Sequence, residues 1–232
     1  MIALDATFVT SAASAGDVPP DARPQIALVG RSNVGKSSLI NALTRLKVAR
    51  TSAAPGKTRL ANVYRIGIGG KTRTRDSARP EHSRGRPGSP AVFLVDLPGY
   101  GYARGGDKSA RDFARLTAEY FGVGRRTPAP AQPARPDGPD AALLVVDSRH
   151  PGLDTDLEAW RWLGALPIAT GIVATKIDKL GRAERRRAIR ELERSFNSPV
   201  LPVSAATGEG MEPLWKLIAR LVSPNPSPKS RP

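Results

Sequence analysis

The chain has no cysteine, only two histidines, and aromatic side chains at 5% of its residues. Without cysteine it can form neither a disulfide framework nor a thiolate metal centre. No apolar run approaches the roughly 20 residues that a membrane-spanning helix needs. Residues 1–17 lack the basic start and the long apolar segment of a secretory signal. These absences predict a cytoplasmic protein without a membrane partner.

Acidic residues are also scarce relative to basic ones, because 21 Asp and Glu face 36 Lys and Arg, for a net charge of +15. An excess of this size predicts a polyanionic partner. Two segments concentrate it: 71–86 has six basic and two acidic side chains, and 182–194 has six arginines and three glutamates. The second has helical spacing. It is either a solvated helix face with i,i+4 ion pairs or a surface for nucleic-acid phosphates.

Short apolar runs alternate with helical patterns along most of the 232 residues. The expected strands are 25–29, 61–68, 92–96, 142–147, 168–175 and 200–203, and the expected helices are 36–45, 108–121, 154–164, 182–196 and 211–222. Strands rich in valine, isoleucine and leucine and separated by helices predict an α/β fold. We expect a mostly parallel six-stranded sheet with helices on both faces. One strand should be antiparallel, because no helix separates 61–68 from 92–96.

The same pattern divides the chain into one domain with additions. Residues 1–22 are interpreted as an N-terminal extension, 23–222 as the domain, and 223–232 as a disordered, basic, proline-rich tail. Two segments inside the domain, 69–90 and 124–139, are interpreted as insertions because they are rich in small residues and proline.

The octapeptide GRSNVGKS, at 30–37, lies between an expected strand and an expected helix, the context that a GxxxxGK[ST] phosphate loop requires. Gly30 and Gly35 allow the backbone to wrap closely round a polyphosphate, whose charge is favoured at a helix N-terminus. Lys36 would contact the outer phosphates as the main catalytic charge, and Ser37 would offer a hydroxyl to Mg²⁺. The candidate phosphate-binding residues are Gly30, Arg31, Ser32, Asn33, Val34, Gly35, Lys36, Ser37 and Ser38.

Further motifs follow later expected strands. In DLPG, at 96–99, Asp96 can hold Mg²⁺ through a water and the Gly99 amide can meet a γ-phosphate. In TKID, at 175–178, Asp178 can accept from N1–H and N2–H₂ of guanine, a donor pair that adenine lacks, with the Lys176 stem along the base. In SAATGEG, at 204–210, the backbone can cap guanine O6. These candidates are Asp96, Leu97, Pro98, Gly99, Thr175, Lys176, Ile177, Asp178, Val203, Ser204 and Ala205.

The segment TSAAPGKTRL, at 51–60, is turn-rich and polar, as a switch loop should be. Thr58 is the expected second protein ligand of Mg²⁺, and Thr51 competes with it by position alone. The switch candidates are Gly56, Lys57, Thr58, Arg59 and Leu60. The motifs occur in the order that a guanine-nucleotide domain needs, so we expect GTP or GDP with Mg²⁺ as ligands.

The stretches GRSNVGKSSLINAL, PGKTRL, DLPGYGYA, DSRHP and TKIDKL resemble the EngB (YihA/YsxC) family of bacterial ribosome-biogenesis GTPases. That family lies within the TrmE–Era–EngA–EngB–septin class of P-loop GTPases. The resemblance implies a Ras-like P-loop G domain at 23–222 and hydrolysis of GTP with Mg²⁺ on Ser37 and Thr58. It implies a switch in assembly of the large (50S) ribosomal subunit, needed for cell division and septum formation. The implied partners of this monomer are rRNA and ribosomal proteins.

The residue directly after DLPG is Tyr100, where many GTPases have a glutamine that orients the attacking water. We therefore expect slow intrinsic turnover, driven by Lys36, Mg²⁺ and the loop amides. Asn33 is a candidate K⁺ ligand, because an asparagine at this loop position helps to hold K⁺ in related GTPases. The alternative is that Asn33 only forms hydrogen bonds within the loop.

Two other functions fit parts of this pattern. One is a nucleotide-gated ribosome- or rRNA-binding module with negligible hydrolysis. The other is an ATP-using P-loop kinase or ATPase, against which TKID and SAA argue. Four further polar residues are given structural roles: His150 is interpreted as a turn residue, and Asp147, Asp154 and Asp156 as strand-end or helix N-cap residues.

Overall fold

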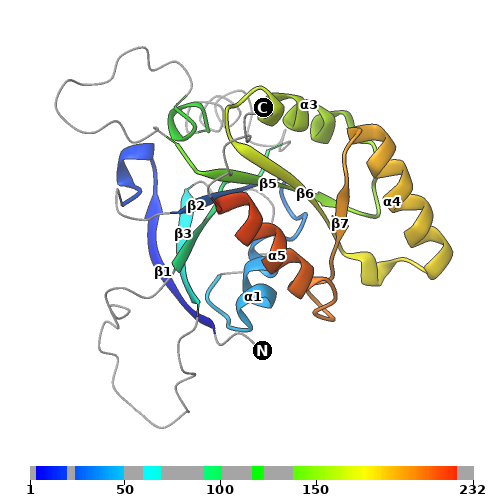
Figure 1. The fold of residues 1–232 in the computed structure, drawn as a ribbon, viewed down its shortest axis with the longest axis horizontal. Helices are drawn as coiled ribbons and strands as arrows, with labels where there is room; N and C mark the ends of the chain where they lie inside the picture. Colours follow the sequence, from blue (N-terminus) through cyan, green and yellow to red (C-terminus); the bar gives the residue numbers. More distant parts are fainter. Residues whose placement is uncertain are drawn as a thin grey trace, which may run out of the picture.

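A seven-stranded sheet in the order β1-β3-β4-β2-β5-β6-β7 forms the centre of the computed structural model (Figure 1). The structure describes residues 4–19, 24–49, 60–68, 91–100, 117–122 and 138–223. The strands are β1 (Leu4–Ala12), β2 (Gln25–Val29), β3 (Ala61–Ile68), β4 (Ala91–Asp96), β5 (Ala141–Asp147), β6 (Ala169–Thr175) and β7 (Val200–Pro202).

The predicted α/β fold is confirmed, including its single reversed strand. β3 runs antiparallel to both of its neighbours, β1 and β4, whereas the remaining neighbours pair in parallel. The predicted pairing of 61–68 with 92–96 is the β3–β4 pair, in which Tyr64 lies opposite Leu94.

The predicted count of six strands is wrong, because β1 lies within residues assigned to an N-terminal extension. Two features of β1 hide it from pattern reading. Its buried side chains, Ala6 and Ala12, are small, while Phe8 is 51% exposed. The pairing with β3 also shifts between Phe8 and Thr10, so the alternation of inward and outward residues is interrupted at Val9.

Four α-helices that lie wholly within the described residues connect or follow these strands. They are α1 (Lys36–Thr44), α3 (Asp154–Gly164), α4 (Arg182–Phe196) and α5 (Met211–Val222), with short 3₁₀ helices η1 (Ala15–Asp17) and η3 (Ile177–Lys179). The last three α-helices have the predicted bounds. Most of the helix predicted at 108–121 lies outside the described residues. Its described part is helical at 117–120. Within the described ranges no helix is both long and apolar enough to cross a bilayer.

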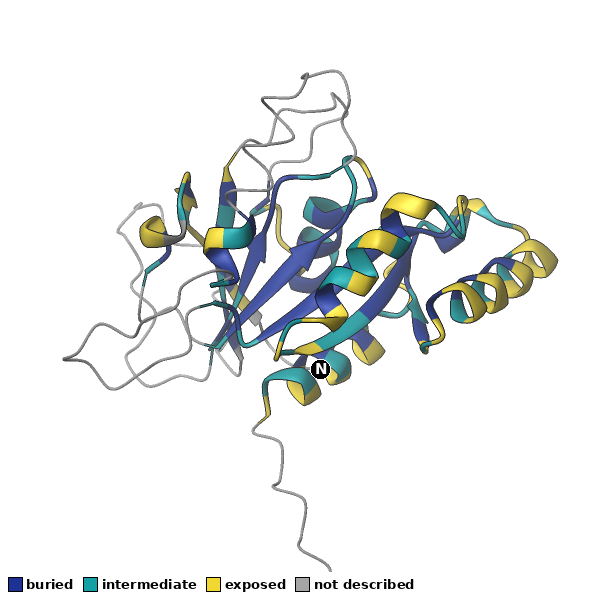
Figure 2. Ribbon diagram, turned by 90° about the horizontal axis from the view of Figure 1, so that it is seen from above, coloured by how far each residue is buried: buried dark blue, intermediate teal, exposed yellow. Residues whose placement is uncertain are grey.

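Apolar residues that alternate along the central strands pack on both sides of the sheet. In β2, Ile26 and Leu28 join a cluster with Leu39 of α1 and Ile218 of α5. Ala27 and Val29 join a second cluster, to which α3 contributes Leu163 and α4 contributes Leu192 and Phe196. Figure 2 shows these strands buried between helices whose outer faces are exposed. The sheet is therefore covered by helices on both faces, as predicted.

The parallel strands bring their carboxyl ends to one edge of the sheet, where ligands of open α/β folds bind. Leu28 of β2 lies opposite Asp96 of β4, and Asp147 of β5 lies opposite Thr175 of β6. Segments up to 143 residues apart therefore meet at this edge through hydrogen bonds. The motifs singled out in the sequence lie there.

Candidate functional site

The phosphate loop, residues 30–35, connects β2 to α1 through backbone conformations that need glycine. A Cβ at Gly30 would overlap the carbonyl oxygen of Val145 in β5, and Gly35 has a φ of 105°. Asn33 also has a positive φ, of 64°, which asparagine tolerates better than most residues. The loop thus lies close against the sheet and leads directly into the N-terminus of α1, where free N–H groups favour an anion.

Lys36 is held inside this loop. Its side chain is only 8% exposed, and its Nζ donates to the carbonyl oxygens of Gly30 at 2.9 Å and Arg31 at 3.3 Å. Burial lowers the pKa of the Lys36 ammonium, and the nearby Asp96 carboxylate opposes that shift. A phosphate that entered the loop would supply the compensating charge at close range.

Ser37 and Asp96 place two oxygens side by side. The Ser37 hydroxyl donates to Asp96 Oδ2 at 2.7 Å, and Asp96 is only 2% exposed. The other oxygen, Asp96 Oδ1, is buried and has no hydrogen-bond partner among the described residues. Burial raises the pKa of Asp96, while Lys36 and Ser37 lower it. A hydroxyl and an unsatisfied carboxylate oxygen are the hard donors that Mg²⁺ takes, so this pair fits the metal.

The DLPG segment returns to the phosphate loop after β4. A Cβ at Gly99 would overlap the backbone nitrogen of Ser32, and the Ser32 N–H donates to the carbonyl oxygen of Tyr100 at 3.3 Å. Leu97 and Pro98, between Asp96 and Gly99, are buried. Asp96 and Gly99 therefore both lie against the loop, as the motif order predicted.

A buried carboxylate, whose contacts are not evident from the sequence, connects the phosphate loop to the DLPG segment. Asp156, in the first turn of α3, is 2% exposed. Its Oδ1 accepts from Tyr100 Oη at 2.8 Å and from Arg31 Nε at 3.1 Å. Burial raises the pKa of Asp156, and the bonds from Tyr100 and Arg31 oppose the shift. Burial and the neighbouring carboxylate also raise the pKa of the Tyr100 phenol.

The interpretation of Asp154 and Asp156 as helix N-cap residues is wrong. The N-cap of α3 is Leu153, which has no side-chain capping bond. No local pattern could reveal the real partners, because Arg31 lies 125 residues and Tyr100 lies 56 residues from Asp156 in the chain.

At the other end of the loop, the TKID segment that follows β6 contacts the backbone of the phosphate loop. Thr175 Oγ1 lies 2.5 Å from the carbonyl oxygen of Val34 and 3.0 Å from that of Val146. Lys176 Nζ donates to the carbonyl oxygen of Asn33 at 2.5 Å and to Asp147 Oδ2 at 2.9 Å. These bonds fix the spacing between the TKID segment and the loop.

Asp147, at the end of β5, binds two basic side chains. It accepts hydrogen bonds from Arg149 and Lys176. Burial favours the neutral acid, but the bonds from Arg149 and Lys176 outweigh burial and hold the pKa of Asp147 well below its usual range. The strand-end position assigned to Asp147 is confirmed, and the residue also positions Lys176.

Asp178 is oriented by the last of the motifs. The buried Ser204 hydroxyl donates to Asp178 Oδ1 at 2.6 Å, and Lys179 forms an ion pair with Oδ2 at 3.3 Å. The bond from Ser204, helped by Lys179, lowers the pKa of Asp178. Ser204 is fixed in turn, because its N–H donates to the carbonyl of Glu209 and its own carbonyl accepts from Gly208. The carboxylate is thus ionised and held in one orientation.

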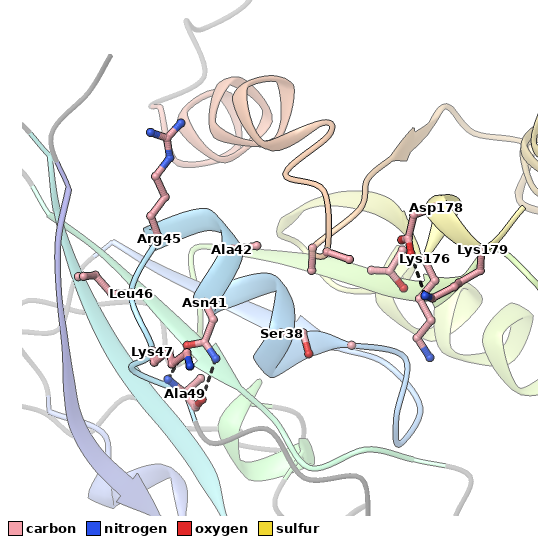
Figure 3. Close-up of a pocket in the computed structure, with 14 residues that line it drawn as sticks. Ser38, Asn41, Ala42, Arg45, Leu46, Lys47, Ala49, Lys176, Asp178 and Lys179 are labelled. Carbon is pink, nitrogen blue, oxygen red and sulfur yellow. Dashed lines mark hydrogen bonds and ion pairs between the residues drawn. The ribbon is translucent and has the colours of Figure 1, made fainter.

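A cavity of about 720 Å³ lies beside Asp178, between α1 and the segments that follow β6 and β7 (Figure 3). Ser38 and Asn41 line it from α1, and Lys176 and Asp178 line it opposite. Ala205, next to Ser204, closes one side. The cavity adjoins the phosphate loop through Gly35, so a ligand with a base at one end and phosphates at the other would fit the arrangement.

The remaining candidates have these positions. Ile177 and Val203 are buried beneath the cavity-lining segments, and Leu60 is exposed directly before β3. Most of the switch candidates lie outside the described residues, namely Thr51, Gly56, Lys57, Thr58 and Arg59.

Comparison with known proteins agrees with this arrangement. A family model described as "50S ribosome-binding GTPase" matches residues 25–176. The "Probable GTP-binding protein EngB" of Symbiobacterium thermophilum is 38% identical over 92% of this chain and 94% of its own length. Its counterpart in Thermotoga maritima is 35% identical over 97% of this chain and 100% of its own length.

Solved structures show the same fold at lower identity. A crystal structure of a probable GTP-binding protein engB has a TM-score of 0.56 and 24% identity, covering 85% of this chain and 98% of that one. The structure of Era with MgGDPNP and nucleotides 1506–1542 of 16S ribosomal RNA has a TM-score of 0.62 and 21% identity. It covers 90% of this chain and 60% of the Era chain.

The fold and the order of motifs along its strand ends define a Ras-like P-loop GTPase. The family model covers more than half of the chain, and the curated relatives match nearly its whole length. The chain belongs to the EngB family of GTP-binding proteins.

Proposed function

We propose that this GTPase is a nucleotide-controlled switch in assembly of the large ribosomal subunit. The observation that carries the proposal is the convergence of Lys36, the Ser37–Asp96 pair and Asp178 on one edge of the sheet, in a family described as ribosome-binding. The net charge of +15 suits an RNA-rich partner. In this account the protein is a cytoplasmic monomer, and its ribosomal role is required for normal cell division and septum formation.

In the proposed site, the amides of residues 30–38 and the Lys36 ammonium bind the phosphates. Ser37 and Thr58 would hold Mg²⁺ directly and Asp96 would hold it through a water, and the metal would neutralise charge on the phosphates. Asp178 accepts from guanine N1–H and N2–H₂, Lys176 lies along the base, and the backbone at 204–205 meets O6. Residues 56–60 form the switch, and the Gly99 amide meets the γ-phosphate.

Hydrolysis in this site relies on fixed charges rather than on a side chain that orients water. Tyr100 occupies the position after DLPG, and its hydroxyl is engaged by Asp156. We therefore propose slow intrinsic turnover, supported by Lys36, Mg²⁺ and loop amides. Asn33, which is exposed at the loop, is the proposed K⁺ ligand. Equal GTPase rates in K⁺ and Na⁺ buffers would remove Asn33 from the mechanism.

Sedimentation with purified large subunits tests the switch. The protein should pellet with the subunit in the presence of a non-hydrolysable GTP analogue and remain in the supernatant with GDP. Small subunits provide the control for binding to RNA in general. Equal pelleting in both nucleotide states, or no pelleting in either, would contradict the proposal.

A second candidate function follows from Tyr100, whose hydroxyl donates to Asp156 rather than to an attacking water. In it, the protein is a nucleotide-gated ribosome-binding module whose hydrolysis is negligible. Single-turnover GTP hydrolysis, measured with and without large subunits, separates the two. A rate that stays at the background level when subunits are added would favour the binding module.

A further inference from the structure

The outer face of α4 carries a row of arginines. The inner face is set by Ala188, Leu192 and Phe196, which are buried, the last two in the core cluster beneath α3 and α4. Residues four apart on a helix lie one above another, so the arginines form a stripe that points away from the core. Figure 2 shows α4 at the end of the molecule with its outer side exposed. The exposed members, here named the α4 arginine row, are Arg182, Arg186, Arg187, Arg190 and Arg194.

Within the described part of the chain, the row is not neutralised by ion pairs. Among the residues that the structure describes, none of the five forms an ion pair, although Glu191 and Glu193 lie on the same helix. The i,i+4 pairs expected for a solvated face are thus not formed in the described part of α4. Basic residues outside the row do form ion pairs: Arg185 pairs with Glu209, and Lys216 pairs with Glu212 at 2.8 Å.

The glutamate nearest to the start of the helix is also engaged elsewhere. Glu184 accepts a hydrogen bond from the backbone N–H of Gly181 at 3.0 Å and so caps the first turn of α4. Its carboxylate is held at the helix N-terminus, away from Arg190 and Arg194 in the later turns. By count, the excess of positive charge lies in the first half of the helix, because residues 182–187 contain four arginines and one glutamate, whereas residues 190–194 contain two of each.

The composition of this face favours a phosphate backbone over other anions. Ala183 is its only exposed apolar residue, so it lacks the apolar or aromatic anchor of a protein interface. A helix that binds at a membrane surface turns its apolar face to lipid, but the apolar face of α4 is buried. Guanidinium groups bind phosphate through several donors without any apolar contact. Row members four residues apart are about 6 Å apart along the axis.

We propose that the α4 arginine row binds the phosphate backbone of structured RNA, an inference that rests on the proposed ribosomal function. The surface adjoins the base end of the site. Only Leu180 and Gly181 separate α4 from η3, which contains Asp178. The Arg185–Glu209 ion pair also connects α4 to the loop that holds Ser204. The RNA-binding face and the base-binding segment are thus part of one continuous, bonded unit.

The double variant Arg186→Gln/Arg190→Gln tests the row. Its matched control is Arg161→Gln/Arg220→Gln, which also removes two positive charges, but from exposed positions on α3 and α5. Binding of each protein to a labelled RNA duplex is measured by fluorescence anisotropy across a range of KCl concentrations. The α4 variant should lower the salt slope by about two units and weaken binding about tenfold or more at low salt. The control should stay within about twofold of the parent.

The GDP affinity of each variant reports on folding and should equal that of the parent protein. Equal losses in the α4 variant and in the control would show that only net charge matters, and this result overturns the proposal. Unchanged RNA binding by the α4 variant also overturns it, even if binding to anionic phospholipid vesicles or to polyglutamate is lost. Failure of the proposed ribosomal function would give a different result. The parent protein would then bind the RNA duplex but would not pellet with large subunits.

Discussion

At the scale of single residues, the base end of the proposed nucleotide site has one carboxylate whose orientation a neighbour sets. Asp178 is ionised and receives the Ser204 hydroxyl, so its acceptor orbitals point in fixed directions. The proposed phosphate end contains Lys36 and the Ser37–Asp96 pair, all three held by hydrogen bonds. Each of these groups can be changed without altering the volume of the side chain much.

Replacing Asp178 with Asn should exchange the preferred base. The amide offers a donor where guanine also has donors, so GDP affinity should fall by about tenfold to 100-fold, as expected for lost hydrogen bonds to a charged group. Xanthine has an oxygen at C2, which the amide can meet, so xanthosine diphosphate should bind the variant more tightly than GDP does. Titration calorimetry with both nucleotides measures the exchange.

The control for this substitution is Asp154→Asn, which removes an exposed carboxylate from the first turn of α3 and should leave GDP affinity unchanged. An Asp178→Asn protein that still bound GDP like the parent would show that the carboxylate does not read the base.

Removing the Tyr100 hydroxyl should destabilise the protein through Asp156. In Tyr100→Phe the buried carboxylate keeps Arg31 but loses one of its two donors. A hydrogen bond to a charged group contributes about 1.5–3 kcal/mol, against about 0.5–1.5 kcal/mol for a neutral one. The comparison is Tyr120→Phe, whose hydroxyl donates to the neutral Gln25 at 3.0 Å. Urea unfolding should show the larger loss for Tyr100→Phe, and an equal or smaller loss would contradict the role of Asp156.

At the scale of secondary-structure elements, the strand ends and the tight turn after β2 build the site. The bounds of α3, α4 and α5 follow from apolar spacing within each segment, which is why the sequence predicted them correctly. β1 escaped prediction because its inward residues are alanines and its pairing is interrupted at Val9. An edge strand of this kind is determined by its neighbour, β3, rather than by its own pattern.

A methyl group at Gly30 should disrupt the turn between β2 and α1. The Cβ would overlap the Val145 carbonyl oxygen, which belongs to the backbone of β5, a central strand paired on both sides. Gly30→Ala should therefore cost about 1–3 kcal/mol of unfolding free energy and abolish binding of GDP. Gly164→Ala, where nothing lies within 4 Å of the added atom, should be neutral or stabilising by about 0.5–1 kcal/mol. Similar unfolding curves for the two variants would contradict this.

The contact of Asp147 with Arg149 and Lys176, at the carboxyl ends of β5 and β6, should depend on pH. The pKa of Asp147 is lower in the folded protein than the value of about 3.9 in an unfolded chain. Its ionised form therefore stabilises the fold above about pH 4, and this contribution is lost as the pH falls toward the folded pKa. The stability difference between the parent and Asp147→Asn, from urea unfolding, should be about 1–3 kcal/mol at pH 7 and shrink below pH 4. A difference independent of pH would show that Arg149 and Lys176 do not stabilise the ionised form.

At the scale of the whole molecule, the sequence predicted most of the fold and the position of the motifs at the strand ends. The phosphate loop, DLPG, TKID and SAATGEG are short segments, each with its own determinants, and their order along a parallel sheet brings them to one edge. What could not be predicted are contacts between distant side chains. The bonds of Asp156 to Arg31 and Tyr100, and of Lys176 to Asn33, exist only once the sheet has formed.

The central claim is that the nucleotide in this site controls association with the large ribosomal subunit. The most direct measurement is sedimentation of the Asp178→Asn protein with purified large subunits. This variant should pellet with a non-hydrolysable xanthosine triphosphate analogue and no longer with the GTP analogue at a concentration that saturates the parent. Pelleting that ignores the base offered, or that is the same without nucleotide, would contradict the central claim.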